Sequence, residues 1–60
     1  MHIIAKSSLE WWRASGERTA DRLFGIVEHQ AKHSGIHDPD LISDLYREAL
    51  TGVHSWELAA

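Results

Sequence analysis

Apolar residues recur at helical spacing through the first half of this chain, and charged residues take the opposite side. The stripe is formed by Leu9, Trp12, Gly16, Ala20, Leu23, Val27 and Ala31. A period of 3.6 residues kept over this length predicts one long amphipathic helix over about residues 8–33. Residues 1–6 precede it as a short N-terminal arm, either packed on the body of a dimer or frayed.

The start of this helix is predicted at Ser7, which is a good N-cap. Its hydroxyl is suited to accept the backbone N–H of Glu10, while the Glu10 carboxylate reaches back to the N–H of Ser7. Ser34-Gly35 ends the helix, because glycine takes the left-handed C′ position easily and lets Ile36 fold back on Ala31.

A second helix begins at once, with Asp38 as its cap and Pro39 at the first helical position. We expect it over about 39–51. Its apolar face comprises Leu41, Ile42, Leu45, Ala49, Val53 and Trp56. Gly52 leaves two alternatives open: the helix ends near Thr51, with or without a restart at Ser55, or it continues to about 58 at a cost of about 1 kcal/mol.

The short connection between the two helices predicts an antiparallel all-α hairpin that forms one domain over residues 1–60. Two helices cannot cover each other's apolar faces, so we expect a homodimeric four-helix bundle. The residues expected to hold the core and the dimer are Leu9, Trp12, Gly16, Ala20, Leu23, Val27, Leu45, Ala49 and Trp56.

Composition supports association, because a chain of 60 residues has a marginal core and contains no cysteine for disulfides. The formal net charge of −3 argues against a general nucleic-acid binder. The longest apolar runs are too short to span a membrane, and the N-terminus does not resemble a signal peptide. A cytoplasmic protein is therefore expected.

Trp11 is the exception to the apolar stripe, since it projects toward the side that carries Arg18, Arg22, His29 and His33. Tryptophan and arginine dominate protein–protein hot spots, so Trp11, Arg18 and Arg22 are the candidate partner-binding residues. The alternative is that the N-terminal arm covers Trp11, and that the two arginines are only a solvated face.

His29, His33 and His37 are spaced four apart, and the first two share a helix face. This spacing is compatible with a divalent metal, and Asp38 and Asp40 could complete a site, but the pattern lacks cysteine and the H-E-x-x-H arrangement. We expect surface histidines and no cofactor, with metal-linked assembly through these three residues as an alternative.

Catalysis has little support, because no serine is fixed beside a histidine and no glycine-rich phosphate loop is present. The leading hypothesis is a non-enzymatic protein–protein interaction module: an adaptor, inhibitor or regulator that binds an unidentified protein. Its size and lack of motifs are typical of accessory proteins of phages and mobile elements. A DNA-associated regulator, using Arg13, Arg18 and Arg22 of a dimer, is the alternative.

Overall fold

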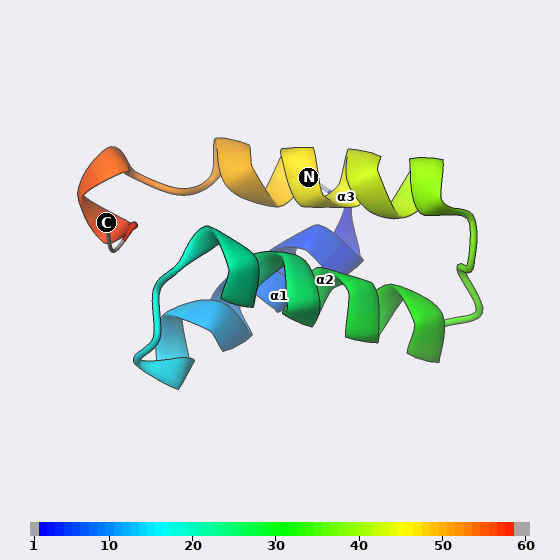
Figure 1. Cartoon of the computed structure of the whole chain (residues 1–60), viewed down its shortest axis with the longest axis horizontal. Helices are drawn as coiled ribbons and strands as arrows, with labels where there is room; N and C mark the ends of the chain where they lie inside the picture. The colour runs from blue at the N-terminus through cyan, green and yellow to red at the C-terminus, as the bar shows by residue number, and fades with distance from the viewer. Residues whose placement is uncertain (1, 59–60) are drawn as a thin grey trace.

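The computed structural model describes residues 2–58, which form three α-helices and a final 3₁₀ turn without any strand. The elements are α1 (Ile3–Ser15), α2 (Ala20–His33), α3 (Pro39–Thr51) and η1 (Ser55–Glu57). Each α-helix packs against the other two. α2 and α3 run side by side in opposite directions, and α1 packs against both of them (Figure 1). The all-α prediction is confirmed, but the two-helix hairpin is wrong.

The predicted long helix over 8–33 is broken between α1 and α2. Gly16 ends α1 in the left-handed region at φ 81°, where a side chain would be strained. Thr19 caps α2, because its hydroxyl accepts the backbone N–H of Arg22 at 3.2 Å. The buried indole N–H of Trp12 donates to the carbonyl of Thr19 at 2.9 Å. The break is therefore held by a glycine, a cap and a tertiary hydrogen bond.

The N-terminal segment is helical rather than an extended arm, so this expectation is also corrected. α1 begins at Ile3, and the side chain of His2 accepts the backbone N–H of Ile4 at 3.1 Å as its N-cap. Ser7 lies inside the helix and caps nothing. The early start brings Ile4 and Ala5 into the core, and this burial favours the helical conformation over a frayed end.

The connection between α2 and α3 follows the sequence prediction. Gly35 adopts φ 89°, and the backbone N–H of Ile36 donates to the carbonyl of Ala31 at 2.8 Å, which closes a Schellman motif. The Asp38 side chain accepts the backbone N–H of Asp40 at 2.9 Å, and Pro39 occupies the first turn. Both helix ends in this connection are confirmed.

α3 ends at Thr51, and the chain makes a new helical turn from Ser55, which is one of the two alternatives the sequence left open. The N–H groups of Gly52 and Val53 donate to the carbonyls of Ala49 and Leu50, both at 3.0 Å. A continuous helix to about 58 is therefore excluded. The turn lets η1 fold back toward α1.

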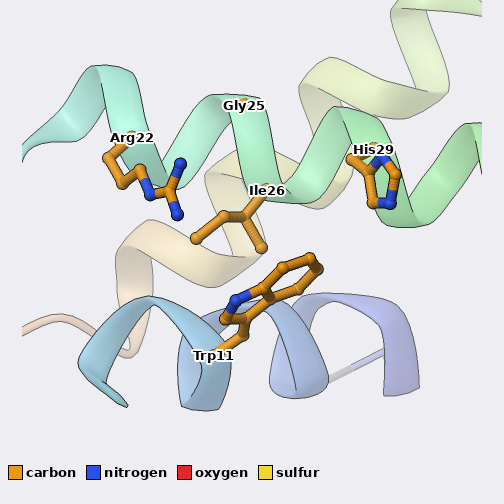
Figure 2. A pocket seen from close by; sticks show the side chains of 5 residues that line it. All are labelled: Trp11, Arg22, Gly25, Ile26 and His29. Carbon is orange, nitrogen blue, oxygen red and sulfur yellow. The ribbon is translucent and has the colours of Figure 1, made fainter. Parts of the chain in front are cut away.

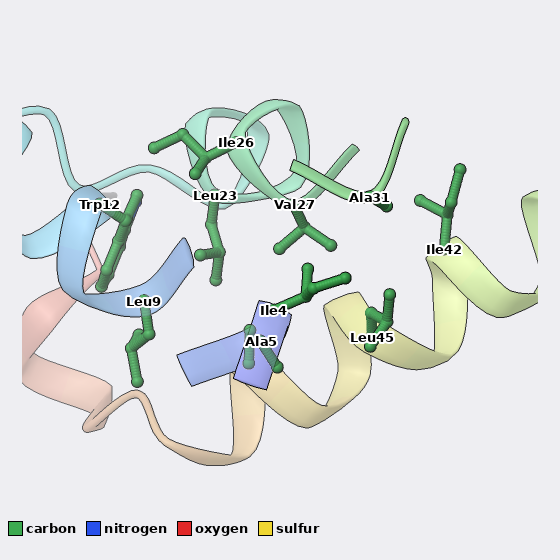
Figure 3. Packing of buried hydrophobic residues seen from close by; sticks show 11 residues of the cluster. Ile4, Ala5, Leu9, Trp12, Leu23, Ile26, Val27, Ala31, Ile42 and Leu45 are labelled. Carbon is green, nitrogen blue, oxygen red and sulfur yellow. The ribbon is translucent and has the colours of Figure 1, made fainter. Parts of the chain in front are cut away.

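One hydrophobic core lies between the three helices (Figure 3). Its buried members are Ile4, Ala5, Leu9, Trp12, Leu23, Ile26, Val27, Ala31, Ile42, Leu45 and Ala49. Six of the nine predicted core residues belong to it. The other three do not: Gly16 is exposed in the α1–α2 turn, Ala20 is half-buried at the start of α2, and Trp56 is 74% exposed.

The third helix changes the argument for a dimer. The apolar faces of α2 and α3 were expected to need a second chain, but α1 of the same chain covers them. The premise of the four-helix bundle is therefore wrong, and dimerisation itself stays a prediction. Over residues 2–58, none of the helices combines the length and the apolar character needed to cross a membrane.

Candidate functional site

An open hollow of about 310 Å³ lies between the outer sides of α1 and α2. Its lining residues are Trp11, Arg22, Gly25, Ile26 and His29. Figure 2 shows Trp11 rising from α1 toward α2, with Arg22 toward one end of the hollow and His29 toward the other. We call these five residues the Trp11 hollow.

Trp11 is held in place while much of its ring stays open to solvent. Its side chain is 43% exposed, and the ring meets His29 edge-on, with the centroids 5.8 Å apart and the planes at 79°. This geometry is a favoured arrangement for aromatic pairs. The exposed residues one turn away from Trp11 on α1 are small: Ser7, Ala14 and Ser15. None of these three side chains is large enough to cover the indole.

Ile26 and Gly25 of α2 also line the hollow, one with an apolar side chain and the other with none. Ile26 is buried and faces the core from the adjacent turn of α2. Gly25 lines the hollow, and a Cβ placed on it would meet no atom within 4 Å beyond its own helix. Packing inside the chain therefore does not require glycine here, although glycine in a helix interior costs about 1 kcal/mol relative to alanine.

Arg22 supplies positive charge at one end of the Trp11 hollow and is weakly held. Its closest carboxylate is Glu17, with Nε and Oε2 4.0 Å apart and both side chains largely exposed. An ion pair of this kind contributes little. At the other end, the ring of His29 stacks on that of His33 at 6.2 Å. The guanidinium of Arg22 is therefore available to an incoming carboxylate.

Two of the three predicted partner-binding residues come together in the structure. Trp11 and Arg22 line the same hollow, and the N-terminal segment does not cover the indole. Arg18 lies in the α1–α2 connection, where its guanidinium donates to the carbonyl of Arg13 at 3.5 Å, so it does not line the hollow. Sequence reasoning missed Gly25 and Ile26, although their spacing from Arg22 and His29 places all four on one helix side.

The geometry gives the alternative hypotheses no added support. His29 and His33 are neighbours on α2, but residues 2–58 contain no group of three or more metal-ligating side chains arranged to hold an ion. The guanidinium of Arg13 donates to the carboxylate of Glu57 at 3.1 Å and to the carbonyl of Gly52 at 2.8 Å. The guanidinium of Arg13 therefore binds the C-terminal segment and does not form one basic surface with those of Arg18 and Arg22.

Comparison with known proteins gives no family to which this geometry can be attached. No protein-family model, curated protein or solved structure was found to match the chain. The function is therefore argued from the residues of the Trp11 hollow.

Proposed function

We propose that this protein is a small non-enzymatic protein-binding module, and that its contact surface is the Trp11 hollow. The observation that carries the proposal is a half-exposed tryptophan with an edge contact to His29, beside an arginine whose ion pair with Glu17 is long, at 4.0 Å, and solvent-exposed. Tryptophan and arginine supply the largest share of binding energy in known interfaces. A pre-positioned indole also reduces the entropy that binding must overcome.

The lining residues define the chemistry of the partner. Trp11 and Ile26 offer apolar surface, Gly25 leaves room for close approach, and Arg22 offers a planar pair of donors. A guanidinium favours a carboxylate, which it binds through two parallel hydrogen bonds. We therefore propose a partner segment that presents an apolar side chain next to an acidic one.

The hollow suits binding better than catalysis. It is open, and the polar side-chain groups of its lining residues are an indole N–H, a guanidinium and an imidazole, without a hydroxyl, thiol or carboxylate among them. Covalent catalysis needs such a nucleophile beside its base, and group transfer gains from excluding water. We therefore propose that the protein acts as an adaptor, inhibitor or regulator through the residues of the Trp11 hollow.

The proposal is tested by affinity capture from cells of the organism that encodes the chain, with the wild type, Trp11→Ala and Arg22→Glu as baits. Ile3→Ala is the matched control, because Ile3 is 77% exposed on α1 and does not line the hollow. We expect a protein that the wild type and Ile3→Ala retain and that Trp11→Ala and Arg22→Glu lose. Titration of that protein should then show a loss of at least about tenfold in affinity for both variants.

Equal capture by all four baits would contradict the proposal. Homodimerisation is not needed to complete the core, since one chain already buries it. Sedimentation equilibrium of the wild type and Trp11→Ala shows whether the hollow binds a second copy of the chain or a different protein. A self-association that Trp11→Ala abolishes would make the second copy the partner.

A further inference from the structure

A second hollow lies on α3 and the α2–α3 connection, apart from the Trp11 hollow. It has a volume of about 210 Å³ and is lined by His2, Ile36, Leu41, Asp44, Leu45 and Glu48. Leu41 is 51% exposed there. We call it the α3 hollow. Its lining includes the apolar side chains of Ile36, Leu41 and Leu45 and the carboxylates of Asp44 and Glu48, so it suits an apolar group that also carries a hydrogen-bond donor.

The chain itself carries such a group in Trp56. This side chain is 74% exposed on η1 and stacks on the ring of His54 at 6.1 Å. Within residues 2–58, no acceptor lies within hydrogen-bond distance of its indole N–H, whereas the N–H of Trp12 is bonded to the Thr19 carbonyl. Tryptophan that becomes buried usually finds a partner for this N–H.

Trp56 projects from a turn that is fixed to the body of the molecule. The neighbouring Glu57 is buried, and its carboxylate accepts from the guanidinium of Arg13, which also bonds the carbonyl of Gly52. Val53 and Leu58, on either side of the turn, pack against the core. An exposed indole on a fixed turn loses little freedom on docking, so its contact area contributes more fully to affinity.

Trp56 does not line the α3 hollow of its own chain. η1 follows the C-terminal end of α3, whereas the hollow extends from the α2–α3 connection along α3 to Glu48. In Figure 1 the C-terminal turn and the α2–α3 connection lie at opposite ends of the molecule. The indole and the hollow are therefore separate surfaces of one chain, which two copies can bring together.

We propose that Trp56 of one copy docks into the α3 hollow of a second copy. The ring covers Leu41, and the indole N–H donates to the Glu48 carboxylate. Asp44 is already engaged by Arg47 at 3.2 Å, whereas Glu48 has no ion-pair partner among the described residues. A second copy fits because the chain carries both halves of the contact. The Trp56 ring and its N–H complement the exposed Leu41 side chain and the Glu48 carboxylate.

The proposed contact joins two different surfaces, so it is heterologous. Such contacts build rings or open chains of copies. It is also independent of the Trp11 hollow. Loss of self-association would therefore contradict only the Trp56 contact. Loss of partner capture would contradict only the function proposed for the Trp11 hollow.

Sedimentation velocity of the full chain, from about 10 µM to about 1 mM, tests the contact over the range of weak association. We expect the average mass of the wild type to rise with concentration. Trp56→Ala and Leu41→Asp should each lower the association constant by at least about tenfold. Leu41 lies in the exposed first turn of α3, where an added acid is compatible with the helix. Ile3→Ala is the control and should associate like the wild type, because Ile3 is exposed on α1 and lines neither hollow.

Mixing the two variants gives the sharpest test. Trp56→Ala keeps its hollow and Leu41→Asp keeps its tryptophan, so an equal mixture should form a 1:1 pair that neither variant forms alone. In nitrogen–proton spectra, the Trp56 indole N–H signal should move with wild-type concentration while that of Trp12 stays fixed. A wild type that remains at 6.8 kDa throughout, unimpaired association of either variant, or a mixture that stays monomeric would each overturn the proposal.

Discussion

Trp11 and Trp12 are neighbours in the sequence and lie in opposite surroundings. Trp12 points between the three helices, is fully buried, and donates its N–H to the carbonyl of Thr19 at 2.9 Å. Trp11, about 100° further round α1, is 43% exposed over the hollow beside α2. The inner side of α1 thus closes the fold, and its outer side offers an aromatic surface. The same residue type is therefore buried in the core at one position and open to solvent at the next.

The largest expected effect comes from the inner side. Trp12→Ala removes a buried ring and the hydrogen bond that holds the α1–α2 break. We expect the free energy of unfolding to fall by about 3–5 kcal/mol, enough to unfold a chain of this size. Circular dichroism during urea titration measures this. A variant that keeps a cooperative transition near that of the wild type would show that Trp12 is not the centre of the core.

Ser8 tests how well the inner side is packed. Its side chain is fully buried, and its hydroxyl has no hydrogen-bond partner. Ser8→Ala removes an unsatisfied polar atom and places a better helix former at the position. We expect the free energy of unfolding to rise by about 1–2 kcal/mol, read from the midpoint of urea unfolding. Ser7→Ala, at the exposed neighbour, is the control, and a loss of stability in Ser8→Ala would contradict this account.

Gly25 separates stability from binding on the outer side. Because a Cβ there meets no other atom, Gly25→Ala should raise the free energy of unfolding by about 0.5–1 kcal/mol. The same methyl group would fill part of the Trp11 hollow, so capture of the partner should weaken. A gain in stability together with a loss of partner capture would support close approach of the partner to Gly25. A variant that gains stability and binds as before would show that Gly25 takes no part in the contact.

The smallest effect on stability is expected at Trp11. Trp11→Ala removes a partly exposed ring that has an edge contact with His29. We expect a change within about 0.5 kcal/mol, as for most surface substitutions. Thermal unfolding beside Ile3→Ala measures it. A loss close to that of Trp12→Ala would place Trp11 in the core and remove the reason for assigning it to a partner.

The sequence predicted the features that depend on neighbouring residues. The Gly35 turn and the start of α3 at Asp38 and Pro39 are both in the structure, because caps and left-handed glycines act within a few residues. The end of α3 at Thr51 is one of two alternatives that the sequence left open. The apolar stripe also identified Leu9, Trp12, Leu23 and Val27 as buried. The exposure of Trp11 followed from the same helical periodicity.

The break at Gly16 is the point where reasoning from periodicity failed. Ser15-Gly16 repeats the Ser34-Gly35 pair that ends α2, and Thr19 offers a cap, but the apolar stripe continues across them in helical register. Local signals and the stripe conflicted, and only packing decides such a conflict. A straight helix would have left its apolar side open, whereas folding α1 back buries it against α2 and α3.

The sequence by itself determined an all-α chain, the end of α2, the start of α3 and the buried side of most of the apolar stripe, because these follow from backbone geometry and side-chain spacing. Tertiary structure alone decided that one chain closes its own core. It also placed Arg22, Gly25 and His29 beside Trp11, and left Trp56 exposed on a turn anchored by Arg13 and Glu57. These outcomes depend on which surfaces bury the most apolar area together, a property of the assembled chain.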